Sequence, residues 1–243
     1  MIAIFRKEVN LFLTSLIGYI AIGIFLLANG LICWVFPDSN IPDGGYATLE
    51  PLFQFAPWVF LLLIPAITMR SFAEENENGT MELLATKPVT DNQIIGGKFL
   101  AALFLVGFSI LPTIVYYFAI SALASPPGNV DTGGIIGSYI GLFLLGAGFV
   151  SVGMFASSLT RNQIVSFIAS LFACFLLFQA FDSVAMLPVF VGKADGILQL
   201  LSMGTHYRSI SLGLLDTRDV LYFLSVVAFF FLLTKTVLAS RKW

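Results

Sequence analysis

Long apolar stretches alternate with short polar ones along the chain, and six of the apolar stretches are long enough to cross a bilayer, which takes roughly 20 mostly apolar residues. The first, third and fourth contain no Asp, Glu, Lys or Arg, whereas the second and sixth each hold one basic residue, Arg70 and Lys235, near one end. Such a residue can extend its side chain to the membrane surface. The pattern predicts an all-α integral membrane protein with six transmembrane helices, at residues 13–36, 52–72, 99–123, 134–158, 163–186 and 220–240.

Two segments outside these spans carry other patterns. In residues 1–12, apolar residues recur at helical spacing at Ile2, Phe5, Val9 and Phe12, while the charged residues lie mostly elsewhere. This is typical of an amphipathic helix that lies on the membrane surface. Residues 187–218 interrupt their apolar positions with charges too often to span, so we expect short re-entrant or interfacial helices there, before the sixth span.

Composition agrees with a membrane protein, because 58% of the 243 residues are hydrophobic and only 11% are charged, against about a quarter in soluble domains. A chain of this length predicts one integral domain, residues 1–243, without a separate soluble catalytic domain. The net charge of -2 gives no electrostatic case for nucleic acid. Cys33 and Cys174 lie inside apolar stretches, where they are typical of small buried hydrophobic residues.

The basic residues near the spans predict the orientation, since Lys and Arg favour cytoplasmic loops. Placing both termini in the cytoplasm puts nine basic residues inside and three outside. The nine are Arg6, Lys7, Arg70, Lys87, Lys98, Arg161, Lys235, Arg241 and Lys242, and the three are Lys193, Arg208 and Arg218. Both termini are therefore expected in the cytoplasm, and residues 73–98 form the longest cytoplasmic loop.

No catalytic motif is evident. The chain has one histidine, His206, which excludes a histidine-pair zinc site and favours a structural role. The sequence Ile94 to Phe99 resembles a phosphate-binding loop, but the residue after the lysine is Phe rather than Ser or Thr. Asp182, toward the outer end of the fifth span, is expected to be a solvated helix terminus rather than an ion site. The chain is expected to bind no ATP and no other cofactor.

The loop at residues 73–98 begins with an acidic segment, where Glu74 and Glu75 must lie outside lipid because each would cost on the order of 3 kcal/mol there. Asn78-Gly79 is expected to end the helix that continues from the second span. Thr80 can cap a short new helix over residues 81–86, and Pro88 ends it. Its apolar face, with Met81 and Leu84, needs something to pack on, because so short a helix is unstable alone. Residues 90–93, TDNQ, form a capping-box pattern that starts the third long helix.

Glycines recur every four residues at the start of the fourth span, at Gly133, Gly137 and Gly141. Small residues at this spacing let two helices approach closely in lipid. We expect these glycines to serve helix packing. The pattern favours packing within the chain over a subunit interface, and leaves both open.

These features together resemble the permease subunits of type-2 ABC exporters, and most of all the GldF-type permeases of gliding-motility systems in Bacteroidota. The similarity covers essentially the whole chain in order. It rests on Arg6-Lys7-Glu8, Arg70, Glu74-Glu75, residues 79–84 (GTMELL), Pro88, Gly97-Lys98 and residues 158–163 (SLTRNQ).

The resemblance implies a coupling helix between the second and third spans that docks on a separate ABC ATPase subunit. Met81, Glu82 and Leu84 would enter a groove of that ATPase, with Gly79, Thr80 and Pro88 bounding the helix. Glu74 and Glu75 would belong to the arm that carries the motion, and Arg161 and Asn162 would make a second contact.

The resemblance also implies the partners and the location. The ATPase would be GldA-like and would hold Mg-ATP, and a second permease chain, GldG-like or a copy of this one, would complete the unit in the bacterial inner membrane. Membrane lipid is the remaining partner. A non-transporting membrane anchor in a motility or secretion machine is the alternative function.

Overall fold

The computed structural model describes residues 1–37, 40–80, 89–188, 192 and 195–240. Within these ranges all regular structure is helical, and none of their residues forms a strand. The elements in chain order are α1 (Ile2–Leu13), α2 (Leu16–Trp34), α3 (Glu50–Thr68), α4 (Arg70–Glu77), α6 (Asp91–Ile110), the 3-10 helix η1 (Leu111–Thr113), α7 (Ile114–Leu123), α8 (Thr132–Leu159), α9 (Gln163–Phe175), the π-helix η2 (Leu176–Ala180), α10 (Phe181–Ala185), α11 (Asp195–Leu201), α12 (Met203–Ser211) and α13 (Thr217–Ser240).

Six helical stretches in the described part of the chain are long and apolar enough to cross a membrane. The prediction of an all-α protein with six membrane-spanning helices is therefore confirmed. The stretches are Leu16–Trp34, Glu50–Glu77, Asp91–Leu123, Thr132–Leu159, Gln163–Ala185 and Thr217–Ser240.

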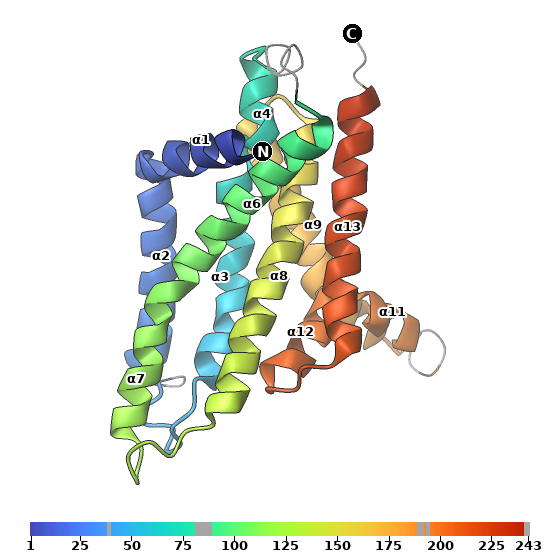
Figure 1. The fold of residues 1–243 in the computed structure, drawn as a ribbon. Coiled ribbons are helices and arrows are strands. Elements are labelled where there is room, and N and C mark those ends of the chain that lie inside the picture. Colours follow the sequence, from blue (N-terminus) through green and yellow to red (C-terminus); the bar gives the residue numbers. More distant parts are fainter. Residues whose placement is uncertain (38–39, 81–88, 189–191, 193–194, 241–243) are drawn as a thin grey trace.

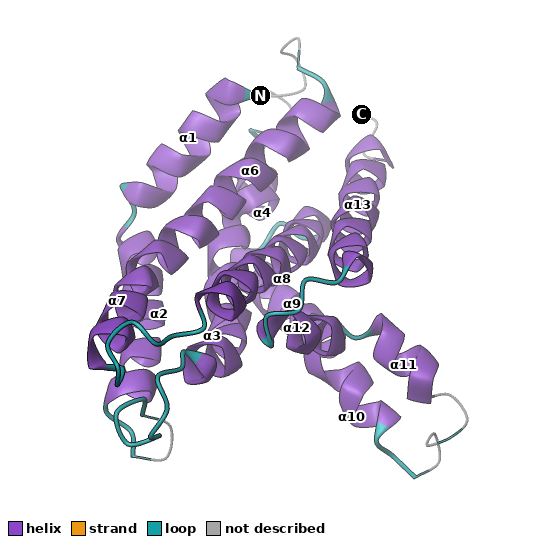
Figure 2. Cartoon of the chain, turned by 60° about the horizontal axis from the view of Figure 1, so that its bottom comes forward, coloured by secondary structure: helices purple, strands orange, loops and turns teal. Residues whose placement is uncertain are grey.

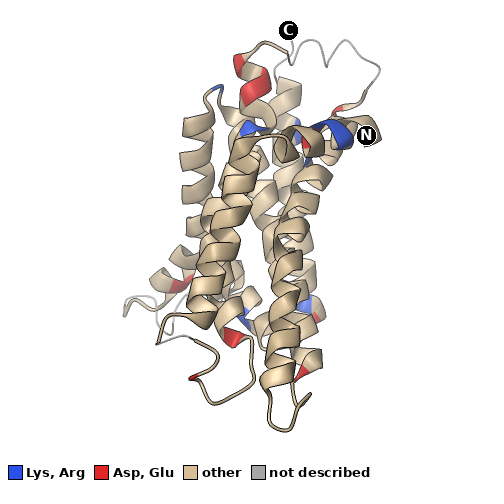
Figure 3. Ribbon diagram, turned by 90° about the vertical axis from the view of Figure 1, so that its left-hand side faces the viewer, with Lys and Arg blue, Asp and Glu red and all other residues tan. Residues whose placement is uncertain are grey.

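The two ends of this helical bundle differ (Figure 1). The start of α1 and the end of α13 lie at one end, together with α4, and α1 runs across this end from the top of α2. We call it the terminal end. The opposite end, which we call the loop end, carries the connections from α2 to α3 and from α7 to α8 (Figure 1). Charged residues are placed near both ends of the bundle (Figure 3).

Helix α8 forms the centre of the bundle, with α3, α6, α9 and α13 around it (Figures 1 and 2). In an apolar stretch of 18 residues in α8, 72% of the residues are buried, against 11% in a stretch of the same length in α13 at the periphery. Small residues allow this central position. A methyl group on Gly146 would lie 2.8 Å from Cγ1 of Val106 on α6, so only glycine admits that approach.

Three short helices follow α9 and η2, and we call α10, α11 and α12 the lobe. Helices α10 and α11 extend sideways from the bundle, and α12 lies against α8 (Figures 1 and 2). Helices α11 and α12 lie within residues 187–218, where the sequence predicts short helices. None of the α11 residues is buried, and its Ile197 and Leu200 are about two-thirds exposed. This segment therefore presents apolar side chains outward, as an element in contact with lipid would.

Candidate functional site

The terminal end combines most of the residues that the sequence singles out, and its main element is α4. This helix continues α3 beyond the level of α1 (Figure 1). It ends as expected at Asn78-Gly79, because Gly79 adopts a positive φ of 66° that favours glycine. The amide of Thr80 then donates to the carbonyl of Glu75 at 3.0 Å, which closes the last turn.

The segment after Thr80 is where the coupling helix is expected. Met81, Glu82, Leu84 and Pro88 lie outside the described residues, so this helix stays a prediction. The chain is described again from Val89, and α6 begins with the expected capping box, in which the side chains of Thr90 and Gln93 bond each other's backbone amides. The coupling segment thus joins two helices whose ends are fixed by local bonds.

A cluster of four charged side chains ties α1, α4 and α6 together. Lys98 of α6 donates to Glu8 of α1 at 2.8 Å and lies 3.0 Å from Glu75 of α4, and Lys7 of α1 donates to the other Glu75 oxygen at 3.0 Å. Only 2% of the Lys98 side chain is exposed. Its ammonium also lies 5.3 Å from the centre of the Phe72 ring. A buried ammonium needs such partners, because an unpaired buried charge is strongly destabilising.

The protonation of Lys7 reflects the same cluster. Partial burial acts to lower the pKa of Lys7, but the hydrogen bond and the charge of Glu75, together with the charges of Glu8 and Glu74, outweigh it and raise the pKa above its usual 10.5. Lys7 therefore stays charged throughout the physiological range. The amphipathic α1 is thus attached to α4 by charge, as well as to the bundle by its buried Val9 and Phe12.

From the sequence, Lys98 is expected at the end of the cytoplasmic loop, and the resemblance implies that Glu75 belongs to an arm, but neither expectation pairs the two residues. The two residues belong to different helices, and Lys98 lies 90 positions from Glu8, so no local pattern could join them. The charges in the sequence could have indicated that Lys98 has an acidic partner. An isolated lysine next to a long apolar stretch requires one, and Glu8 and Glu75 are available at the same membrane depth.

The junction between α3 and α4 is held by a side chain of α8. The Ser157 hydroxyl accepts hydrogen bonds from the amides of Phe72 and Ala73 and donates to the carbonyl of Met69, with all three distances at 3.0 Å. Ser157 is fully buried. Met69, between the two helices, is therefore a fixed junction rather than a loose one.

The second predicted contact, at Arg161 and Asn162, lies in the turn between α8 and α9. The Asn162 side chain caps α9 by accepting from the amides of Ile164 and Val165 at 2.8 and 3.3 Å. The Asn76 side chain of α4 donates to the carbonyl of Thr160 in the same turn at 3.2 Å. The structure thus brings the turn of Arg161 and Asn162 against the arm α4, with Arg161 exposed.

The three predicted packing glycines of α8 have different surroundings. A methyl group on Gly141 would lie 2.6 Å from Cγ2 of Ile210 on α12, and one on Gly137 would lie 3.2 Å from Cα of Gly213. At Gly133 it would meet only the nearby Asp131 side chain, at an ordinary 3.6 Å. Gly137 and Gly141 thus face the turn after α12 and α12 itself, within the same chain.

A second polar cluster lies toward the loop end, and it corrects the interpretation of Asp182. This residue is only 4% exposed rather than a solvated terminus. Its carboxylate accepts from the Thr205 hydroxyl at 2.7 Å and from Arg208 at 3.2 Å, because α12 packs against η2 beside the start of α10. Nearby, His206 bonds the Asp219 carboxylate at 2.7 Å and the Leu200 carbonyl at 3.1 Å. The Asp182 group connects α10 to α12, and the His206 group connects α12 to α11 and to the long helix α13. In the described part of the chain, no group of three or more His, Cys, Asp or Glu side chains could hold a metal ion.

Comparison with known proteins identifies the family. A model of the ABC-2 family transporter proteins matches residues 40–240, which run from the connection before α3 to the end of α13. No curated protein matches the chain.

Proposed function

The chain belongs to the ABC-2 family of transporter proteins, and we propose that it couples ATP hydrolysis by a separate ATPase subunit to export or to gliding motility across a bacterial inner membrane. It is the permease subunit of an ABC transporter, a membrane component. The family match over residues 40–240 is the observation that carries the proposal. Because the chain has no complete phosphate-binding loop, Mg-ATP belongs on the ATPase partner and its work reaches the permease by mechanical contact.

In this proposal the terminal end faces the cytoplasm, which agrees with the distribution of basic residues. The coupling segment, with Met81, Glu82 and Leu84, docks on the ATPase, bounded by Thr80 and Pro88. The arm α4 then receives the motion through Gly79. Arg161 and Asn162 make the second contact from the turn between α8 and α9, which Asn76 already connects to the arm.

The contacts of α4 support this transmission. Glu75 joins α4 to α6 through a buried ion pair with Lys98 and to α1 through a partly exposed one with Lys7, and Ser157 joins the first turn of α4 to α8. Glu74 lies beside Glu75 on the same helix. A force on the coupling segment therefore acts on several spans at once rather than on a free loop.

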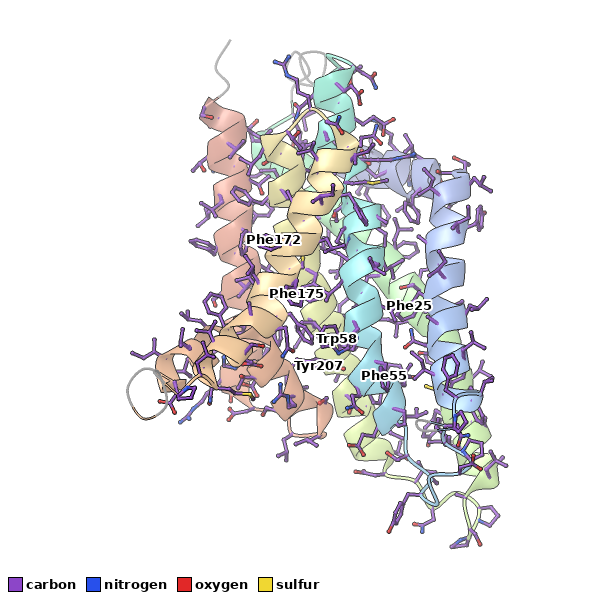
Figure 4. The ribbon with its side chains drawn as sticks, turned by 180° about the vertical axis from the view of Figure 1, so that it is seen from behind. Phe25, Phe55, Trp58, Phe172, Phe175 and Tyr207 are labelled. Atoms are coloured by element: carbon purple, nitrogen blue, oxygen red, sulfur yellow. The ribbon has the colours of Figure 1, made fainter. Side chains whose placement is uncertain are left out.

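A second permease chain would cover the face formed by α2, α3 and α9 (Figure 4). Here α9 presents the exposed apolar stripe Ile164, Ile168 and Phe172, and Trp58 of α3 is 43% exposed. Gln54 of α3 is exposed on this face, and the half-buried Gln179 of η2 donates to the Ser183 hydroxyl at 3.4 Å. An exposed amide is costly in lipid, so a partner chain or a water-filled path between two permeases suits Gln54 better.

The finer assignment follows the GldF resemblance. The ATPase is then GldA-like, and the second chain is GldG-like or a copy of this one. A transport assay separates this from the anchor function. The purified complex in lipid should move lipid or polymer in the presence of ATP, whereas an anchor would bind the ATPase and move neither.

A docking experiment tests the proposal. The double substitution Met81→Asp and Leu84→Asp should abolish ATPase association and permease-stimulated ATP hydrolysis, because charges would replace the apolar contact. A matched control is Leu214→Asp with Leu215→Asp, two exposed leucines between α12 and α13. If the first pair left association unchanged, the coupling assignment would be wrong.

A further inference from the structure

Helix α3 carries two prolines inside its length, Pro57 and Pro65, and each removes a backbone donor from the helix. Without an amide proton at Pro57, the carbonyl of Phe53 loses its usual partner four residues on. The Tyr207 hydroxyl of α12 donates to that carbonyl at 2.6 Å. A residue of the lobe therefore fills the gap that the proline creates.

Tyr207 is suited to this position. It is 4% exposed, and Figure 4 shows it where α12 meets α3. Burial raises the pKa of Tyr207 far above its usual value, so its hydroxyl keeps the proton that it donates. Since α12 is itself attached to α10 through Asp182, the bond from Tyr207 connects α3 to the whole lobe.

A similar arrangement occurs at the other end of α3. In an uninterrupted helix the Ala73 amide would bond the Met69 carbonyl. Here the Ser157 hydroxyl bonds both of these groups and the Phe72 amide as well. A side chain that enters the hydrogen-bond ladder in this way is a known cause of helix bends.

We propose that α3 transmits motion like a lever that is held at two points. At the inner joint, the Ser157 hydroxyl of α8 holds the junction between α3 and the arm α4. At the outer joint, the Tyr207 hydroxyl holds α3 to α12. Both hydroxyl groups come from other helices and bond backbone groups of α3 or α4. Motion of the arm is then delivered through α3 to the lobe at the loop end instead of being absorbed at Met69 or Pro57. Ser157 and Tyr207 are positioning residues. The inference rests on the proposed function, because it assumes that the ATPase moves the arm.

The inner joint is tested first without any partner. Amide hydrogen exchange of the permease in lipid nanodiscs should be roughly tenfold faster over Arg70–Glu77 in Ser157→Ala, because two amides lose their partner. Ser151→Ala is the matched control, since the Ser151 hydroxyl of the same helix bonds the Gly148 carbonyl of its own helix at 2.7 Å. Ser157→Thr, which keeps a hydroxyl, should restore slow exchange. Equal exchange in Ser157→Ala and wild type would overturn the inner joint.

The outer joint is tested in the complex with the ATPase. In wild type, a non-hydrolysable ATP analogue should change the exchange of both α4 and α12. Tyr207→Phe removes only the hydroxyl and should keep the change in α4 but lose the change in α12. Tyr222→Phe is the matched control, because the Tyr222 hydroxyl bonds the Leu201 carbonyl at 2.7 Å rather than α3.

The outcomes separate the lever from the proposed function. If the analogue changed nothing in α4 of wild type, the ATPase coupling would be wrong, while the partner-free exchange of Ser157→Ala would still decide the inner joint. If Tyr207→Phe kept the full response of α12, the lever would be refuted with the coupling intact.

The proposal also predicts an effect on activity. Ser157→Ala should still associate with the ATPase, but permease-stimulated ATP hydrolysis should fall several-fold.

Discussion

Glu74 and Glu75 are neighbours on α4 with the same side chain, yet their surroundings differ. Glu75 is 7% exposed and lies against Lys98 and Lys7, whereas Glu74 is half-buried and takes part in none of the ion pairs of the described residues. At the scale of single residues, the position on the helix therefore decides which of two identical groups holds the terminal end together.

The first prediction follows from this difference. Glu75→Gln should lower the free energy of unfolding by about 1.5–3 kcal/mol, because it removes the ion pair with the buried Lys98 and weakens the charged hydrogen bond from Lys7. Glu8 still pairs with Lys98, so the loss stays below that of a fully unpaired buried charge. Denaturant unfolding in detergent measures the change. Glu74→Gln is the control, and an equal shift in both variants would contradict the assigned pairing.

Lys7 gives a prediction on pH. Its pKa in the folded protein lies above the unfolded value of 10.5, so its contribution to stability is fully present below that pH. The contribution is lost as the pH rises through the folded pKa. The unfolding temperature should therefore fall above pH 10.5, and part of this fall should be absent in Lys7→Gln. An identical pH profile of the variant and the wild type would argue against the ion pair with Glu75.

At the scale of elements, the neighbours of α8 lie so close at some positions that only glycine leaves enough room there. Its glycines at positions 137 and 141 lie against α12 and the following turn, and Gly146 lies against α6. The glycine pattern predicts close packing without naming the partner helix. The partner depends on how α12 folds back toward α8, which the spacing of glycines in α8 does not contain.

A pair of glycine substitutions tests this packing. Gly141→Ala should destabilise the protein by about 1–3 kcal/mol, because its methyl group collides with Ile210. Gly133→Ala should be neutral or stabilise by about 0.5–1 kcal/mol, since alanine is the better helix residue and meets no crowded neighbour there. Thermal unfolding of both variants is compared. Equal effects would favour an interface role for the whole repeat.

At the scale of the whole molecule, the exposed apolar faces are unequal in character. The face of α2, α3 and α9 carries an exposed amide at Gln54, whereas α13 presents mainly large apolar side chains such as Leu221, Leu224, Phe229 and Leu232. A mainly apolar face suits lipid, and a face with an exposed amide suits a partner chain. The arrangement favours the second permease at α3 and α9.

Cysteine cross-linking in native membranes tests that arrangement. Phe172→Cys on α9 should cross-link to a second permease chain, because Phe172 is 59% exposed on the proposed interface. Phe229→Cys on α13, 57% exposed, is the matched control and should stay uncross-linked. The native Cys33 and Cys174 are fully buried and should not interfere. Cross-links at position 229 instead of 172 would move the interface to α13.

The sequence by itself determined the features that depend on neighbouring residues. Six spans follow from apolar length, the end of α4 from Asn78-Gly79, and the start of α6 from its capping box, because hydropathy and helix caps are local properties. It also indicated which segments form the candidate site, although the coupling segment itself stays a prediction.

Only the tertiary structure decided how these segments are joined. The pairs Lys98 with Glu8, Phe72 with Ser157 and Tyr207 with Phe53 lie 90, 85 and 154 positions apart. The buried state of Asp182 likewise depends on α12 packing beside the start of α10. A polar side chain in a membrane bundle must find a partner, but which one it finds is set by how whole helices pack.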